Sequence, residues 1–152
     1  MNTLRPVVLF AALALMASLL AFADDKVEGD LGQLQGTWTG LVGPEKNIPI
    51  TAIFKGKVVT LKVNLPDGNE IELKGEVKLD ESATPNKKLD WTKFTRPDGE
   101  SFGDNSAIYK FDNKDTIIIC SGGPGNDRPK EFKAADAGEQ HPDLLMLKRK
   151  SD

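Results

Sequence analysis

Apolar and polar residues alternate along most of this chain, and turn-forming residues interrupt the alternation at short intervals. In the clearest run, between residues 70 and 79, the apolar side chains occupy odd-numbered positions, namely Ile71, Leu73, Val77 and Leu79. Glutamate and lysine fill the even-numbered positions of the same run. Successive side chains of an extended strand point to opposite faces, so this pattern predicts a half-buried β-strand. A chain built from such segments must cover their apolar faces with one another.

Turn chemistry separates these segments. Residues 59–65 alternate in the same way, and Pro66-Asp67-Gly68-Asn69 divides them from the run that follows. Proline presets the first turn dihedral and glycine accepts a positive φ, so the arrangement predicts a β-hairpin. The motif Pro97-Asp98-Gly99-Glu100 repeats the same device further along the chain.

Eight strands are predicted in this way, at about residues 34–42, 48–55, 59–65, 70–79, 87–96, 103–111, 114–120 and 143–150. A helical turn fits only near residues 27–34 and 128–135, because no segment beyond residue 23 has a 3.6-residue apolar period with caps. We therefore expect an all-β fold. Closure into a single antiparallel eight-stranded barrel removes both sheet edges, and a two-sheet β-sandwich is the alternative.

The first 23 residues are typical of a secretory signal. Arg5 is followed by an uncharged apolar stretch at residues 7–20, and Ala21-Phe22-Ala23 offers small residues where a signal peptidase cleaves. The sequence thus predicts a signal peptide at residues 1–23 and one β-barrel domain at residues 24–152. We expect an exported protein, periplasmic or secreted, with no stable membrane anchor after cleavage. A retained anchor is the alternative, although residues 7–23 are at the lower limit for a membrane span.

Composition narrows the function classes. Removal of the signal leaves 19 basic against 23 acidic residues, and no basic stripe with interleaved aromatics occurs, so nucleic-acid binding is not expected. Cys120 is the single cysteine, which excludes an intrachain disulfide, and a small buried hydrophobe is favoured there over a reactive thiol.

Catalytic and metal-binding parts are scarce. His141 is the only histidine, so neither a histidine-rich metal site nor a zinc cluster with Cys120 is expected. His141 precedes a proline and is expected in an exposed loop, and residues 112–115 fit a hairpin turn better than a calcium loop. We expect no metal, no cofactor and no enzymatic activity. The long stretch at residues 121–141 is expected to be a functional loop or a lid.

Gly36-Thr37-Trp38 resembles the Gly-x-Trp element that opens lipocalin-type barrels. In that superfamily a basic residue of the last strand packs across the tryptophan, and Arg149 stands at the corresponding position here. A wider set of motifs over residues 31–150 resembles an uncharacterised lipocalin-like domain family common in planctomycete bacteria; they are Leu34 to Trp38, Lys78-Leu79-Asp80, Ile108-Tyr109, Cys120, Arg128-Pro129 with Phe132, and Leu147-Lys148-Arg149. The resemblance implies a barrel and an exported location but no activity. In the long loop we expect Arg128 to anchor the loop and Phe132 to plug the barrel.

Two functions follow from such a barrel, and they differ in what fills it. An eight-stranded barrel either is filled by its own side chains or encloses one small ligand. The first hypothesis is binding of a small apolar ligand, with Trp38, Phe54, Leu61, Trp91 and Tyr109 expected to line the pocket. The second is a packed barrel that acts as a structural or protein-interaction module of the cell envelope.

Overall fold

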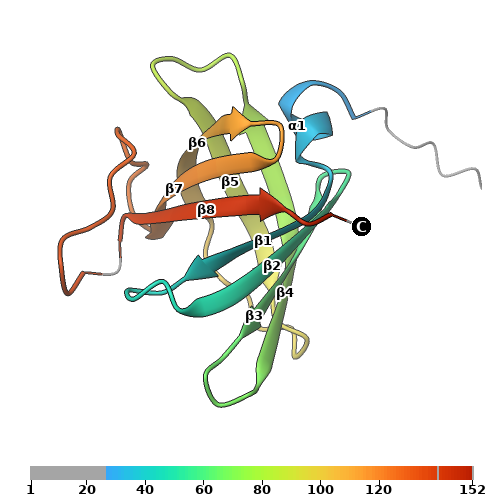
Figure 1. Ribbon diagram of the computed structural model, residues 1–152, viewed down its shortest axis with the longest axis vertical. Helices are drawn as coiled ribbons and strands as arrows, with labels where there is room; N and C mark the ends of the chain where they lie inside the picture. The colour runs from blue at the N-terminus through green and yellow to red at the C-terminus, as the bar shows by residue number, and fades with distance from the viewer. Residues whose placement is uncertain (1–26, 140, 152) are drawn as a thin grey trace, which may run out of the picture.

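The fold is seen in a computed structural model that describes residues 27–139 and 141–151 (Figure 1). The predicted signal peptide, residues 1–23, lies outside the described residues. A short helix, α1, precedes eight strands: α1 (Gly29–Leu34), β1 (Gly36–Val42), β2 (Ile48–Lys55), β3 (Val58–Asn64), β4 (Glu70–Asp80), β5 (Lys87–Thr95), β6 (Asn105–Asn113), β7 (Thr116–Pro124) and β8 (Asp143–Arg149). All eight predicted strands are present, with differences only at their ends.

The strands form one closed barrel in which each pairs antiparallel with its neighbour in the sequence. The last strand returns to the first, where Trp38 lies opposite Arg149 and Gly40 lies opposite Leu147. The predicted barrel is therefore confirmed, and the alternative of a two-sheet sandwich is wrong. Closure gives every strand two partners, which satisfies the backbone hydrogen bonds that an open edge would leave exposed.

The two ends of the barrel differ. At the upper end of the barrel in Figure 1, α1 lies near short connections at residues 56–57, 81–86 and 114–115. Gln35 ties the helix to the β2–β3 turn, because its side chain accepts from the Gly56 amide at 2.6 Å and donates to the Gly56 carbonyl at 3.0 Å. Leu34 is fully buried there. We call this the closed end, and the opposite end, which carries the connections at 43–47, 65–69, 96–104 and 125–142, the open end.

A bulge in β5 turns an aromatic side chain into the barrel. The pairing of β4 with β5 shifts between Lys74 and Glu76, and Lys93 in the bulge has φ +56°. Phe94 follows it and is buried. A Cβ at Gly75 would lie 2.5 Å from Cδ2 of Phe94, so this ring occupies the space that the glycine leaves.

The long loop at residues 125–142 lies over the outside of the barrel. Residues 128–135, one of the two places where a helical turn would fit the sequence, contain only bends and irregular chain. Ile108 and Cys120 are buried although they face away from the interior cluster, and the Cys120 thiol donates to the Lys133 carbonyl at 3.5 Å. The expectation that Cys120 is a buried residue is confirmed. Within the described residues, no helix is long and apolar enough to cross a membrane.

Candidate functional site

Trp38 fills the closed half of the barrel. Its side chain is fully buried, and its indole N–H donates to the Leu34 carbonyl at 2.7 Å. The Arg149 guanidinium carbon lies 4.3 Å from the ring centroid, so the stacking contact expected between these two residues is present. Cation–π attraction of this kind contributes about 0.5–2 kcal/mol, depending on desolvation.

Arg149 also joins three segments at this end. Its guanidinium donates to the carbonyls of Gln35 at 2.7 Å and Gln33 at 2.5 Å, at the C-terminus of α1. Its Nε forms an ion pair with Asp115, in the β6–β7 turn, at 3.3 Å. Carbonyls at a helix end have no partner within the helix, so Arg149 supplies bonds that the fold needs there. The Trp38–Arg149 pair is thus a structural clasp.

A second polar cluster holds α1 in place. The Tyr109 hydroxyl donates to Oδ2 of Asp30 at 2.7 Å, and the Lys87 ammonium donates to the same oxygen at 2.6 Å. Burial, reinforced by the Asp30 carboxylate, holds the pKa of Tyr109 well above its usual range. Tyr109 therefore works as a neutral hydrogen-bond donor at the closed end.

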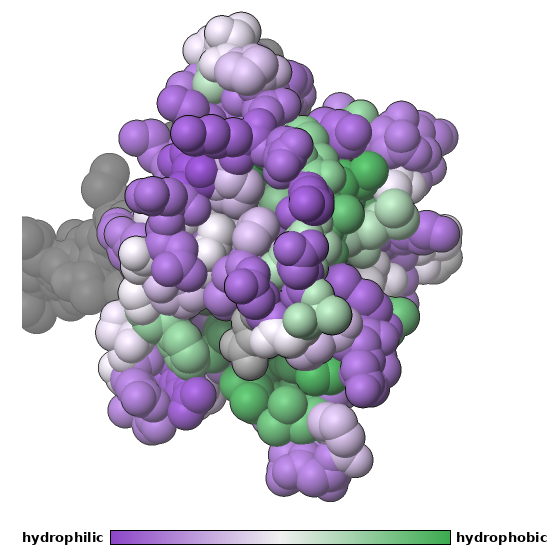
Figure 2. All heavy atoms as spheres, turned by 90° about the vertical axis from the view of Figure 1, so that its left-hand side faces the viewer, coloured by the Kyte–Doolittle hydropathy of each residue, from purple (hydrophilic) through white to green (hydrophobic). Residues whose placement is uncertain are grey.

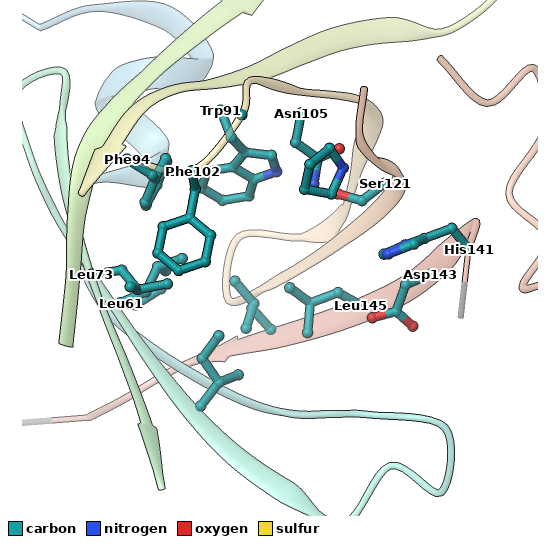
Figure 3. Close-up of a pocket in the computed structure, with 15 residues that line it drawn as sticks. Leu61, Leu73, Trp91, Phe94, Phe102, Asn105, Ser121, His141, Asp143 and Leu145 are labelled. Atoms are coloured by element: carbon teal, nitrogen blue, oxygen red, sulfur yellow. The ribbon is translucent and has the colours of Figure 1, made fainter. Parts of the chain in front are cut away.

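The open half of the barrel is hollow. A cavity of about 220 Å³ lies there (Figure 3). Its wall is mostly apolar and includes Leu61, Leu73, Trp91, Phe94, Phe102 and Leu145. Four polar residues, Asn105, Ser121, His141 and Asp143, lie at the side of the cavity where β6, β7 and β8 meet the long loop. An apolar wall with a few converging polar groups is the usual composition of a small-molecule site.

Of the five residues predicted to line a pocket, Leu61 and Trp91 do so. The prediction is wrong for Trp38, Phe54 and Tyr109, which are buried in the packed half. Phe54 lies directly next to the cavity wall, with its ring centroid 6.3 Å from that of Trp91. All five side chains point inward, as the alternation of side chains along each strand predicts. Alternation does not set the position of each residue along the barrel axis.

Sequence reasoning missed two aromatic residues that line the cavity, Phe94 and Phe102. The Phe102 amide donates to the Phe94 carbonyl at 2.7 Å, which holds the two residues together on either side of the turn at residues 97–100. Simple alternation from Trp91 places Phe94 on the outer face, and only the bulge reverses this. Gly75 on the neighbouring strand was a signal, because an inward-facing glycine leaves room for a large side chain.

Charged groups and a histidine border the cavity at the open end. Lys46, in the β1–β2 turn, forms an ion pair with Asp143 at the start of β8. His141 is exposed, as expected, and its ring lies against the backbone of Gly123, where an added Cβ would come within 2.6 Å of the ring. Asn105 accepts from the Gly123 amide at 3.0 Å. One face of the histidine ring therefore packs against the glycine.

Arg128 anchors the long loop to the outer side of β5 and β6. It forms an ion pair with Asp90 at 2.6 Å and donates to the carbonyls of Leu89 at 3.2 Å and Ala107 at 2.5 Å. These contacts provide the anchor expected of Arg128.

Phe132 lies elsewhere than expected. Its ring centroid is 4.7 Å from the ammonium of Lys110, an exposed residue of β6, and it is not part of the interior cluster. The expectation that Phe132 plugs the barrel is wrong, because the loop that carries it crosses the outside of the sheet.

Metal ligands and the Cys120 thiol are the remaining candidates for chemistry. In residues 27–139 and 141–151, no three or more histidine, cysteine, aspartate and glutamate side chains are grouped so that they would hold a metal ion. Burial raises the pKa of the Cys120 thiol, which lowers its reactivity as a nucleophile.

Comparisons with protein-family models, curated proteins and solved structures each give no significant match. The closed eight-stranded antiparallel barrel is compatible with a lipocalin-like fold. The resemblance to the planctomycete family stays a prediction.

Proposed function

We propose that this protein is an exported, lipocalin-like barrel that binds a small, mainly apolar molecule in the cavity at its open end. The observation that carries the proposal is the division of the interior: the closed half is packed around Trp38, whereas the open half has a cavity of about 220 Å³ with apolar walls and a polar side. An interior that served stability alone would gain by filling such a space, because voids forfeit packing energy.

The cavity limits the size of the ligand. Drug-sized ligands occupy pockets of roughly 300–1,000 Å³, and an engineered apolar cavity of about 150 Å³ admits benzene. A cavity of about 220 Å³ therefore suits one ring with a short substituent, or a short branched chain. Asn105, Ser121 and His141 provide hydrogen-bonding groups for one polar atom on such a ligand.

A packed barrel that acts as a protein-interaction module of the cell envelope is the second candidate. It is favoured by two exposed apolar side chains on the outer face of neighbouring strands, Leu41 of β1 and Met146 of β8, which are 48% and 50% exposed. Apolar residues of this kind mark protein contacts when they form larger patches. On this view the cavity is a packing defect and binds nothing.

Two-dimensional ¹⁵N NMR separates the candidates, because the protein has only two tryptophans. Titration with benzyl alcohol should shift the indole signal of Trp91, which lines the cavity, and leave that of Trp38, which lies in the packed half. Native mass spectrometry of the purified protein should reveal a co-purifying small molecule.

A matched pair of variants controls for nonspecific effects. Leu145→Phe adds volume inside the cavity and should abolish the Trp91 shift. Met146→Phe adds a ring at the next position, on the outer face, and should leave the shift unchanged. If no saturable shift of Trp91 occurs with a panel of small apolar probes and nothing co-purifies, ligand binding is refuted and the packed module is favoured.

A further inference from the structure

A second hollow lies beside the cavity at the open end. It has a volume of about 330 Å³ and lies between the β1–β2 turn and the long loop. We call it the rim groove; its apolar lining comes from Val42, Ile48, Val63, Ala134, Ala135 and Pro142. The face that carries the open-end loops has apolar residues gathered between hydrophilic ones (Figure 2).

The rim groove is continuous with the barrel interior. Val42 and Val63 pack against the buried core, so the floor of the groove belongs to the inner surface of the barrel. His141 and Asp143 line both the groove and the cavity, and the two side chains lie next to each other at the cavity edge in Figure 3. The two apolar hollows therefore share one polar boundary.

The residues at that boundary are held by contacts with their neighbours and are accessible to a ligand. The His141 ring packs against Gly123, and Asp143 forms an ion pair with Lys46. The side chains of Lys46 and Asp143 remain 39% and 29% exposed, so a bound molecule can reach both. A ligand that passes between the hollows must offer hydrogen-bonding atoms at this point, since a purely apolar segment would desolvate these polar groups without replacing their bonds to water.

The charges at the boundary favour a neutral polar group. An anionic group would face the Asp143 carboxylate; Glu139 also lines the groove, but it is exposed and water screens its charge. A cationic group would face the ammonium of Lys46. Because the Lys46–Asp143 pair already balances its own charge, a dipolar group with an acceptor and a donor fits better than either ion.

We propose that the cavity and the rim groove are two halves of one binding site, which takes an elongated neutral amphiphile with two apolar parts joined by an amide or ester. One apolar part occupies the barrel cavity, the other lies in the rim groove, and the polar link contacts His141, Asp143 and Lys46. This inference rests on the proposed function and names the class of ligand.

Three probes test it by NMR titration. N-benzylbutanamide has the two-part form with a neutral link, N-benzylbutan-1-amine has the same length with a cationic link, and benzyl alcohol fills one hollow only. The amide should bind about tenfold or more tightly than either of the others, because only it satisfies both hollows and the boundary. It should also shift the backbone signals of Val42 and Ala135.

Substitutions at neighbouring positions of β1 provide the control. Val42→Phe fills the groove and should weaken binding of the amide about tenfold while binding of benzyl alcohol is unchanged. Leu41→Phe, on the outer face, should change neither. Ala134→Phe, in the exposed loop, gives the same test of the groove if Val42→Phe does not fold.

The outcomes distinguish the two proposals. If benzyl alcohol binds but the amide binds no more tightly and groove-filling variants have no effect, the two-part site is refuted and the simpler cavity remains. If none of the probes shifts the Trp91 signal, both proposals fail.

Discussion

Replacement of Trp38 by alanine tests whether the packed half of the barrel carries most of the stability. The side chain is fully buried, its indole N–H donates to the Leu34 carbonyl at 2.7 Å, and Arg149 stacks on its ring at 4.3 Å. Removal of a buried tryptophan side chain costs about 3–5 kcal/mol. We expect a value near the upper end, because the substitution also leaves the guanidinium without its aromatic partner and a buried carbonyl without its donor.

Trp91→Ala is the matched comparison. Trp91 is nearly as buried, with 7% of its surface exposed, but it borders the cavity and so has fewer packing partners to lose. Trp91→Ala should lower the free energy of unfolding by at least about 1 kcal/mol less than Trp38→Ala does. A comparison of two tryptophans removes the intrinsic hydrophobicity of the side chain from the result.

Urea unfolding followed by far-ultraviolet circular dichroism is the assay, since fluorescence changes with the loss of either indole. Small domains have about 5–15 kcal/mol of stability, so Trp38→Ala can approach complete unfolding. Trp38→Phe keeps a six-membered aromatic ring but removes the five-membered part of the indole with its N–H, and it should cost about 1–3 kcal/mol. A loss below about 1 kcal/mol for Trp38→Ala, or a loss for Trp91→Ala that equals or exceeds it, would refute the division into a packed and a hollow half.

Two further predictions concern contacts outside the cavity. Tyr109→Phe removes the hydroxyl that donates to Asp30 and should lower the free energy of unfolding by about 1–2 kcal/mol near neutral pH. This difference should shrink above about pH 10, because the unfolded wild type then loses its phenolic proton while the folded state, in which the pKa of Tyr109 is raised, must keep it; a loss that stays constant up to pH 11 or so would contradict the role of the hydroxyl. Arg128→Met should free the long loop and speed the labelling of Cys120 by a thiol reagent about tenfold or more, whereas the wild type should react slowly at pH 8 or so because burial raises the thiol pKa. An unchanged labelling rate would show that Arg128 does not hold the loop.

Much of the fold was predictable because its signals are local. Alternation and turn residues place all eight strands, and the segment at residues 66–69 forms the expected turn, in which the Gly68 amide donates to the Leu65 carbonyl at 3.0 Å. The Trp38–Arg149 contact was also predictable, through resemblance to lipocalin-type barrels, because the two residues lie opposite each other on the strands that close the barrel.

The site was predicted less well. Alternation along the strands places Leu61 and Trp91 on the inward face, where they line the cavity. Trp38, Phe54 and Tyr109 also face inward, but they lie in the packed half. The face on which a residue lies is a property of its own strand. How far along the barrel axis it lies depends on the stagger of all eight strands.

By itself the sequence determined which residues form strands, where the chain turns and which face of each strand is apolar, since these follow from local dihedral preferences and a period of two. Only the tertiary structure decided that the bulge at Lys93 turns Phe94 inward and that the long loop covers the outside, which leaves Phe132 against Lys110. It also brought His141 and Asp143 to the boundary between cavity and groove. These placements depend on the closure of the barrel, which joins residues far apart in the chain and has no signature in any one segment.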